Sequence, residues 1–297
     1  MHNRRSFIKS ASLYSAAVLA APSVPSWLNK KSPIIGLQLY TVRDAMQTNA
    51  ASTLAKVAEI GYNSLEGATY TGTEKFYGMD PQTFKGVLKT NGLVMRSCHY
   101  RVGEDKGNDA TMKGTILDDW QRAVDDAAAL GIAYMVCAWL SPKERLGLDH
   151  YKKLAGDFNK AAETCKAAGI QFCYHNHDFE FEQQDGKYPY DVLLNETDAA
   201  LVKMEMDMYW VNKAGQDPIS LFEKHPGRFP LWHLKDMDAT PAHAFTEVGN
   251  GTIDFKKIFA HTKTAGMKYF FVEQDQCPGS PFDSITSSIT YIKKNLV

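Results

Sequence analysis

Eight short apolar segments rich in β-branched and aromatic residues recur along the chain at intervals of 28 to 39 residues. Longer segments with helical periodicity separate them, so the sequence predicts strands and helices in alternation. This alternation indicates a parallel sheet covered by helices, and eight units in about 265 residues favour a closed α/β barrel, the (β/α)₈ fold. The predicted strands are Ile34–Tyr40, Tyr62–Gly67, Leu93–His99, Ile132–Leu140, Ile170–His177, Leu201–Asp207, Leu231–Lys235 and Lys268–Glu273.

The segments between the strands carry the signals of helix ends. A helix is predicted over Asp118–Leu130, where apolar residues recur on one face, and Gly131 is a suitable C-terminal cap. An open doubly wound sheet is the alternative, but no glycine-rich phosphate motif follows the first predicted strand. No low-complexity linker divides the chain, so we expect residues 31–297 to form one domain.

The N-terminal region has the pattern of an export signal. Arg4 and Arg5 form a twin-arginine pair, and the weakly apolar stretch Ala11–Ala21 follows it. That stretch is too short and too rich in alanine and serine for a membrane span. We therefore expect residues 1–30 to be a twin-arginine signal region, with cleavage near Ala20 and the mature protein in the periplasm. The alternative is a basic amphipathic start with no role in export.

Composition limits the class of partner. The formal net charge of −1 gives no general attraction to nucleic acid or to anionic membranes. We expect a small carbohydrate substrate, no nucleic acid and no stable membrane insertion; a homo-oligomer is compatible with the sequence, which does not fix the oligomeric state. The cysteines form no CxxC motif and are expected to be free thiols: Cys98, Cys137, Cys165, Cys173 and Cys277.

Polar residues gather where the predicted strands end, which is where a (β/α)₈ barrel places its active site. Side-chain alternation puts His175 with His177 on one face, Glu205 with Asp207, and His233 with Lys235. The remaining strand-end polar residues are Gln38, Tyr40, Glu66, His99 and Glu273. Burying so many ionisable groups without a cation is costly, so the pattern predicts one divalent metal bound by imidazole and carboxylate ligands.

Each of these residues also has a structural interpretation. Glu205 can form a buried ion pair with Lys203, Asp207 can cap the following turn, and Glu273 can pair with a neighbouring lysine. A single strand-end histidine is more often a hydrogen-bonded core residue than a ligand. The metal site is favoured because strands five to eight all end in a ligand type and are neighbours around a barrel.

Five motifs carry a resemblance to a known family. They are Gly36–Tyr40, Tyr174–Phe181, Met206–Trp210, His233–Asp236 and Val248–Phe255. With them the chain resembles the sugar phosphate isomerase/epimerase-like, xylose isomerase-like TIM barrel family, and within it an exported Bacteroidota-type subgroup. The resemblance covers nearly everything after the signal region.

The resemblance implies a metal site on His175, Asp207, His233 and Glu273. Many relatives have a glutamate in place of His175, so the ligand on the fifth strand is either His175 or His177. The metal is Mn, Co, Fe, Ni, Zn or Mg. The resemblance also implies acid–base chemistry through an enediolate.

Roles follow for the other strand-end residues. The candidates for the acid or base are His177, Glu180, His99 and Glu66, and Lys235 is placed to hydrogen-bond a substrate oxygen. The candidate substrate-binding residues are Gln38, Tyr40 and Trp210, with Trp139 as a further aromatic wall.

The predicted activity is isomerisation or epimerisation of a non-phosphorylated keto-sugar. The alternatives are a lyase or dehydratase acting on a 3-keto-glycoside, a barrel that binds sugar without turnover, and a metal-dependent nuclease similar to endonuclease IV. The balanced charge and the export pattern do not favour the nuclease.

Overall fold

A computed structural model describes residues 33–107 and 111–297. The predicted signal region, residues 1–30, lies outside the described residues. The compact unit Ile34–Val297 contains the whole barrel.

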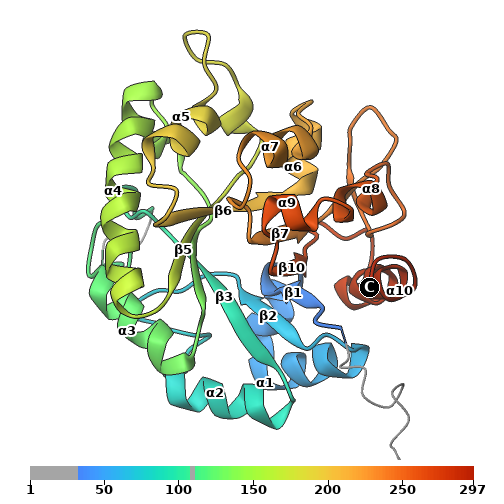
Figure 1. The fold of residues 1–297 in the computed structure, drawn as a ribbon. Coiled ribbons are helices and arrows are strands. Elements are labelled where there is room, and N and C mark those ends of the chain that lie inside the picture. The colour runs from blue at the N-terminus through green and yellow to red at the C-terminus, as the bar shows by residue number, and fades with distance from the viewer. Residues whose placement is uncertain (1–32, 108–110) are drawn as a thin grey trace, which may run out of the picture. The chain divides into compact units, whose positions relative to one another are not determined.

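The eight predicted strands are all present and form one closed parallel barrel. In Figure 1, β10 (red) lies beside β1 (blue), and the register Gly36↔Phe271 closes the sheet. The strands are β1 Gly36–Gln38, β2 Ser64–Gly67, β3 Val94–Tyr100, β4 Tyr134–Cys137, β5 Gln171–His175, β6 Val202–Asp207, β7 Leu231–Leu234 and β10 Tyr269–Val272, with a separate antiparallel pair, β8 Asp236–Met237 and β9 Phe245–Thr246.

Helices surround the barrel, and local sequence explains several of their ends. Asp80 caps α2 by accepting from Gln82 N at 2.9 Å and Thr83 N at 3.0 Å, and Gly131 ends α3 in the left-handed conformation. The helices are α1 Arg43–Ile60, α2 Pro81–Thr90, α3 Trp120–Leu130, α4 Leu148–Ala167, α5 Pro189–Glu196, α6 Met208–Lys213, α7 Pro218–Lys224, α8 Phe255–Phe259, α9 Thr262–Ala265 and α10 Pro281–Asn295; short 3₁₀ turns are Leu39–Val42, Pro142–Glu144 and Phe179–Phe181.

Side-chain alternation on β6 separates the apolar core from the polar interior. Met204 and Met206 pack into the large apolar layer between sheet and helices. The intervening Glu205 and Asp207 are completely buried and take part in the polar clusters of the barrel interior. A small apolar cluster of other strand residues lies within the barrel and consists of Val136, Cys173, Leu231 and Phe271. Parallel register places Asp207 opposite His233, so these ligand types meet at one level.

The loop after β7 is fixed by one carboxylate. Asp236 accepts hydrogen bonds from Gly249 N at 2.9 Å, Gly251 N at 3.1 Å and Ile253 N at 3.2 Å. A Cβ on Gly251 would lie 2.2 Å from Asp236 Oδ1, so this approach needs a residue without a side chain. The motif His233–Asp236 therefore combines inward-facing residues with an anchor for the neighbouring loop.

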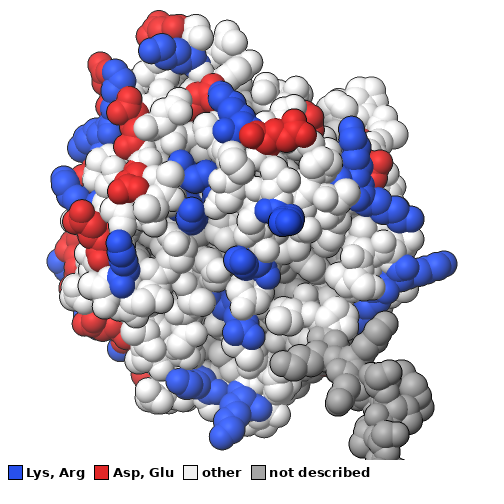
Figure 2. Space-filling model, viewed as in Figure 1, with Lys and Arg blue, Asp and Glu red and all other residues white. Residues whose placement is uncertain are grey.

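Charged side chains are unevenly distributed over the face in Figure 2. Acidic side chains lie mainly along its left and upper parts, while lysine and arginine side chains stand singly among uncharged ones over the centre and lower part. The five cysteines are free, and all but Cys277 are buried. Within the described part of the chain, none of the helices combines the length and apolar character needed to cross a lipid bilayer.

Candidate metal centre

Four ligand-type side chains from consecutive strand ends converge in the barrel; we call His175, Asp207, His233 and Glu273 the outer set. All four are buried. His233 Nδ1 lies 2.9 Å from Glu273 Oε2, 3.1 Å from His175 Nε2 and 3.7 Å from Asp207 Oδ2. His175 Nε2 is 3.4 Å from the same Asp207 oxygen. These four side chains therefore lie close enough together to bind one metal ion, and their role as ligands stays a prediction.

The spacing of the outer set fits a divalent metal. Four ligands at about 2.0 Å from a tetrahedral Zn²⁺ lie about 3.3 Å from one another. The contacts of His175, Asp207 and Glu273 with His233 span 2.9 to 3.7 Å and bracket that value. Two imidazole nitrogens and two carboxylate oxygens facing one point are a donor set that Zn²⁺, Mn²⁺, Co²⁺, Fe²⁺ or Ni²⁺ accepts.

The charges around the outer set also favour a bound divalent cation. Lys235 Nζ lies 2.7 Å from Glu273 Oε2, 3.1 Å from Asp207 Oδ2 and 2.9 Å from Asp275 Oδ2. Burial opposes the charge of Lys235, but these three carboxylates outweigh burial and hold its pKa well above the usual value. One ammonium balances only one of the three carboxylates. A divalent cation would supply the missing positive charge.

The two histidines of the outer set differ in electrostatic environment. Burial and the neighbouring His233 lower the pKa of His175 to about 4, so this imidazole is neutral near pH 7. A neutral imidazole is the form that binds a metal. Burial also opposes the charged form of His233, but Glu205, Glu273 and Glu66 hold its pKa well above the usual value. A metal that binds His233 must therefore displace a proton.

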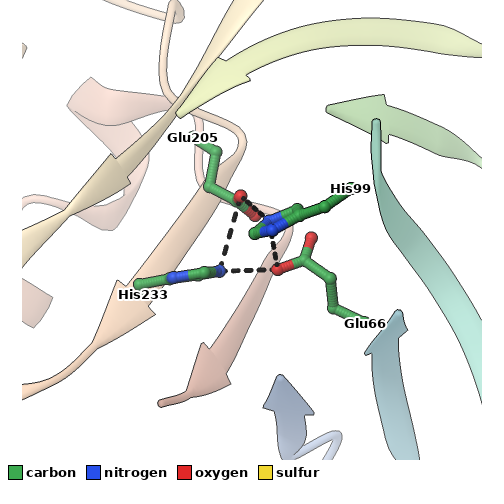
Figure 3. A group of neighbouring side chains, drawn as sticks. All are labelled: Glu66, His99, Glu205 and His233. Carbon is green, nitrogen blue, oxygen red and sulfur yellow. Dashed lines mark hydrogen bonds and ion pairs between the residues drawn. The ribbon is translucent and has the colours of Figure 1, made fainter. Parts of the chain in front are cut away.

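A second cluster shares His233; we call Glu66, His99, Glu205 and His233 the inner set (Figure 3). His99 Nε2 lies 3.0 Å from both Glu66 Oε1 and Glu205 Oε2. His233 Nε2 lies 2.5 Å from Glu66 Oε1 and 3.4 Å from Glu205 Oε2. The inner set lies deeper than the outer set, because Glu205 precedes Asp207 by two residues on β6.

A cavity of about 380 Å³ opens above the outer set. Its walls include Tyr40 and Trp139, which remain 42% and 40% exposed although both are large aromatic residues. The other lining residues are Ala68, Thr69, His99, Tyr100, Arg101, Ala138, His175, His177, Lys235, Glu273 and Asp275. The outer set is thus reached from solvent through an aromatic-walled opening.

His177 is the predicted acid–base residue best placed in this cavity. Its ring lies 5.0 Å from that of His175 and stacks on Phe179 at 5.4 Å. Its buried Nδ1 has no hydrogen-bond partner among the described residues. Burial and His175 lower the pKa of His177, so the ring is a neutral base near pH 7.

Four other predicted catalytic or substrate-binding residues do not line the cavity, and one of them, Glu66, belongs to the inner set. Glu180 accepts hydrogen bonds from Tyr174 Oη at 2.5 Å and from the backbone N of His177 at 2.9 Å, which holds it behind β5. Trp210 packs against His177 with ring centroids 5.4 Å apart. Gln38 is completely buried beneath the cavity and belongs to the surroundings of the inner set.

The sequence did not reveal two members of the site. The sequence suggests an ion pair between Glu205 and Lys203, but Lys203 Nζ instead contacts the Gly227 carbonyl at 3.2 Å, and Glu205 contacts His99. The second residue is Asp275, which lies two residues beyond Glu273 and contacts Lys235. The same alternation that identified Glu273 could have identified Asp275.

Comparison with known proteins identifies the family. A profile of the xylose isomerase-like TIM barrel family matches residues 54–294, which is most of the chain. The chain belongs to this family. Sugar isomerases, epimerases and dehydratases are among its relatives, and the buried imidazole and carboxylate clusters are consistent with a divalent metal.

Relatives are similar at moderate identity. A sugar phosphate isomerase/epimerase of Parabacteroides distasonis ATCC 8503 has a crystal structure with a TM-score of 0.75 and 28% identity, covering 89% of this chain and 98% of that one. An inosose dehydratase of Serratia proteamaculans (strain 568) is 23% identical, covering 76% of this chain and 86% of its own. Several other inosose dehydratases match over about half of their own length.

A more distant structure contains a metal. The IOLI protein, solved with a bound zinc atom, has a TM-score of 0.68 at 14% identity, covering 88% of this chain and 97% of that one. At this identity the similarity shows the fold alone.

Proposed function

We propose that this barrel is a divalent-metal-dependent sugar isomerase or epimerase acting on a non-phosphorylated keto-sugar through an enediolate. One observation carries the proposal: the outer set lies at the floor of a cavity beside His177, whose buried Nδ1 has no partner among the described residues. A metal-type donor set next to a free base is the arrangement that proton removal beside a carbonyl needs.

The reaction uses residues with separate tasks. His175, Asp207, His233 and Glu273 hold the metal, which when bound polarises the sugar carbonyl and the adjacent hydroxyl. His177 Nδ1 accepts the proton from the carbon next to the carbonyl, and the C–H electrons form the enediolate. Return of that proton to the neighbouring carbon completes isomerisation, whereas epimerisation is completed when solvent water protonates the same carbon from the other face and His177 releases its proton to solvent.

Other cavity residues orient the substrate. Lys235 lines the cavity and its ammonium contacts three carboxylates, so a substrate oxygen that displaces one of these carboxylates accepts a hydrogen bond from it. Tyr40 and Trp139 present exposed rings on which the apolar face of a sugar can lie. Arg101 is the only other lysine or arginine among the described lining residues, and this small number of strongly basic side chains supports a substrate without phosphate.

A dehydratase is the second candidate function, favoured by the similarity to inosose dehydratases. It shares proton abstraction with the first candidate and differs in the next step. The enediolate electrons expel a β-hydroxyl, as water after protonation, or the substituent of a 3-keto-glycoside. The product then gains a carbon–carbon double bond, whereas epimerisation conserves composition.

A proton-exchange assay tests the proposal and separates the two outcomes. Metal-loaded protein is incubated in deuterated water with free ketoses, inososes and 3-keto-glycosides, and the products are followed by NMR. We expect deuterium in a sugar of unchanged composition for isomerisation and an unsaturated product for dehydration. His177→Asn should greatly reduce exchange while retaining metal. Binding without exchange by the wild type would instead support a sugar-binding barrel without turnover.

We also propose that the chain is exported to the periplasm through its twin-arginine segment. Arg4 and Arg5 precede the apolar stretch, and this export route carries folded proteins, which suits metal loading before transport. Cell fractionation of the wild type and of a double Arg4→Lys, Arg5→Lys variant tests this. Equal amounts of both in the periplasm contradict it.

A further inference from the structure

We propose that Gln38, Glu66, His99 and Glu205 are positioning residues that keep a proton on Nε2 of His233 and thereby leave Nδ1 to bind the metal. This inference rests on the metal site of the proposed function, but not on the reaction. His233 belongs to both sets, so either of its nitrogens could be the ligand. The hydrogen-bond directions around Gln38 decide between them.

The orientation of the Gln38 amide is fixed from the backbone. Tyr40 N donates to Gln38 Oε1 at 3.0 Å, so the amide NH₂ must point the other way. That NH₂ lies 2.9 Å from Glu66 Oε1 and 3.2 Å from His99 Nδ1. If the Gln38 amide were reversed, its oxygen would face Glu66 Oε1, and the hydrogen bond from Tyr40 N would be lost. Gln38 is therefore a donor to Glu66.

His99 contacts both carboxylates of the inner set through one nitrogen. Gln38 Nε2 lies 3.2 Å from His99 Nδ1 and 3.3 Å from Nε2, whereas the two carboxylate oxygens contact Nε2 alone, so Nε2 carries a hydrogen. His99 Nε2 then donates toward Glu66 Oε1 and Glu205 Oε2, each 3.0 Å away. Both carboxylates are completely buried, and both contact the same nitrogen of His99 (Figure 3). His99 thus helps to hold Glu66 in place.

Glu66 in turn acts on His233. Its Oε1 accepts from Gln38 and lies 2.5 Å from His233 Nε2. At this distance a proton must lie between carboxylate and imidazole, so His233 Nε2 is a donor. His233 Nδ1 faces His175 Nε2, Glu273 Oε2 and Asp207 Oδ2 instead. A metal-binding histidine that donates its other N–H to a carboxylate is held in one tautomer and one orientation.

The two sets differ in the donors they contain. In the inner set, Gln38 and the two Nε2 atoms donate to Glu66 Oε1 and Glu205 Oε2, while Glu66 Oε2 and Glu205 Oε1 have no hydrogen-bond partner among the described residues. In the outer set the acceptor atoms of His175, Asp207 and Glu273 surround His233 Nδ1, and the ammonium of Lys235 is the donor. The cation fits the outer set, and the inner set supports it. This assigns Gln38 and Glu66 to metal positioning, where the sequence suggested substrate binding and acid–base roles.

Two measurements test the proposal. In Zn²⁺-loaded protein labelled with ¹⁵N-histidine, NMR should show His233 with a proton on Nε2 and none on Nδ1. By competition titration with Zn²⁺, Glu66→Gln should weaken metal affinity about 10- to 100-fold, because the glutamine can present its NH₂ to Nε2 and release the tautomer. Gln38→Met, which keeps the volume but removes the donor, should weaken affinity less.

Glu144→Gln is the matched control, because Glu144 is also a buried carboxylate but accepts from Glu104 N, Asp105 N and Ser141 N in the loops. The Glu144→Gln variant should bind Zn²⁺ with the same affinity as the wild type. A metal-bound or unprotonated Nε2 on His233 would overturn the proposal and place the cation in the inner set. Unchanged affinity in Glu66→Gln would also overturn it, while leaving the proposed function intact. A wild type that binds no metal would overturn both.

Discussion

Glu66 Oε1 and His233 Nε2 lie 2.5 Å apart although 167 residues separate them in the chain. β2 and β7 are not neighbours in the barrel, so the contact crosses its interior. Closure of the sheet between β1 and β10 brings the two strands to face each other. The hydrogen bond that orients His233 therefore forms only when the barrel is complete, because no local sequence motif contains both residues.

Replacing Asp207 with asparagine should abolish metal binding and turnover. Asp207 Oδ2 faces His175, His233 and Lys235, and the amide removes the charge that balances the cation. The loss of affinity should exceed the roughly 10- to 100-fold expected for a supporting carboxylate. Elemental analysis measures the metal, and thermal unfolding with added Zn²⁺ measures its binding, since a ligand at 100 times its Kd stabilises by about 2.7 kcal/mol.

The control for this variant is Asp283→Asn, an exposed carboxylate in the first turn of α10. It should bind metal like the wild type. Full metal content and turnover in Asp207→Asn would contradict the assignment of the outer set.

Replacing Trp139 with alanine should raise KM with little change in kcat. Trp139 lines the cavity wall, 40% exposed, and contributes contact area to bound sugar without reaching the proposed base. An interaction made equally with substrate and transition state changes KM alone. Leu146→Ala is the control, because Leu146 is 76% exposed and outside the described cavity lining. Equal KM values for the two variants would argue against Trp139 as a substrate wall.

Glu180 should make stability depend on pH. Burial raises the pKa of Glu180 to about 7 from an ordinary value near 4.5. The folded protein then binds more protons than the unfolded chain between these two values, so its free energy of unfolding falls as pH rises from about 4.5 to about 7. The effect of this one group is on the order of 3 kcal/mol.

Glu180→Gln should remove that contribution, because the amide can still accept from His177 N and donate to Tyr174 Oη. Urea unfolding of both proteins at pH 5 and pH 8 measures the difference. The variant should gain stability relative to the wild type at pH 8. The same difference at both pH values would show that Glu180 does not titrate in this range.

Gly251→Ala should destabilise the fold by more than 1 kcal/mol. Its Cβ would lie 2.2 Å from Asp236 Oδ1 and 2.4 Å from the Met237 carbonyl, so the anchored loop must move. Gly86→Ala is the matched control, since Gly86 lies within α2 with nothing within 4 Å of a new Cβ. It should stabilise by about 0.5–1 kcal/mol. Chemical denaturation gives both values, and equal effects would contradict this account of the loop.

Periodicity predicted the barrel because each strand is a local apolar run with its own helix after it. The same alternation predicted which strand-end residues face inward, and the family resemblance implied which of them form the outer set. His175, Asp207 and His233 are all such inward-facing residues.

Contacts across the barrel and turns after strands were not predictable in this way. Lys203 lies two residues from Glu205 on the same face of β6. Its ammonium nevertheless contacts the Gly227 carbonyl, so Glu205 pairs with His99 and not with Lys203. Glu180 follows β5 closely, but the 3₁₀ turn Phe179–Phe181 directs it behind the strand. Side-chain direction in such turns depends on hydrogen bonds that only the fold creates.

The amide N–H of Tyr40 binds Gln38, while the ring of the same residue forms part of the cavity wall. A sugar that displaces this turn would therefore also disturb the chain of contacts leading through Glu66 to His233. Substrate occupancy and metal retention are then thermodynamically linked, and each ligand must change the affinity for the other by the same factor.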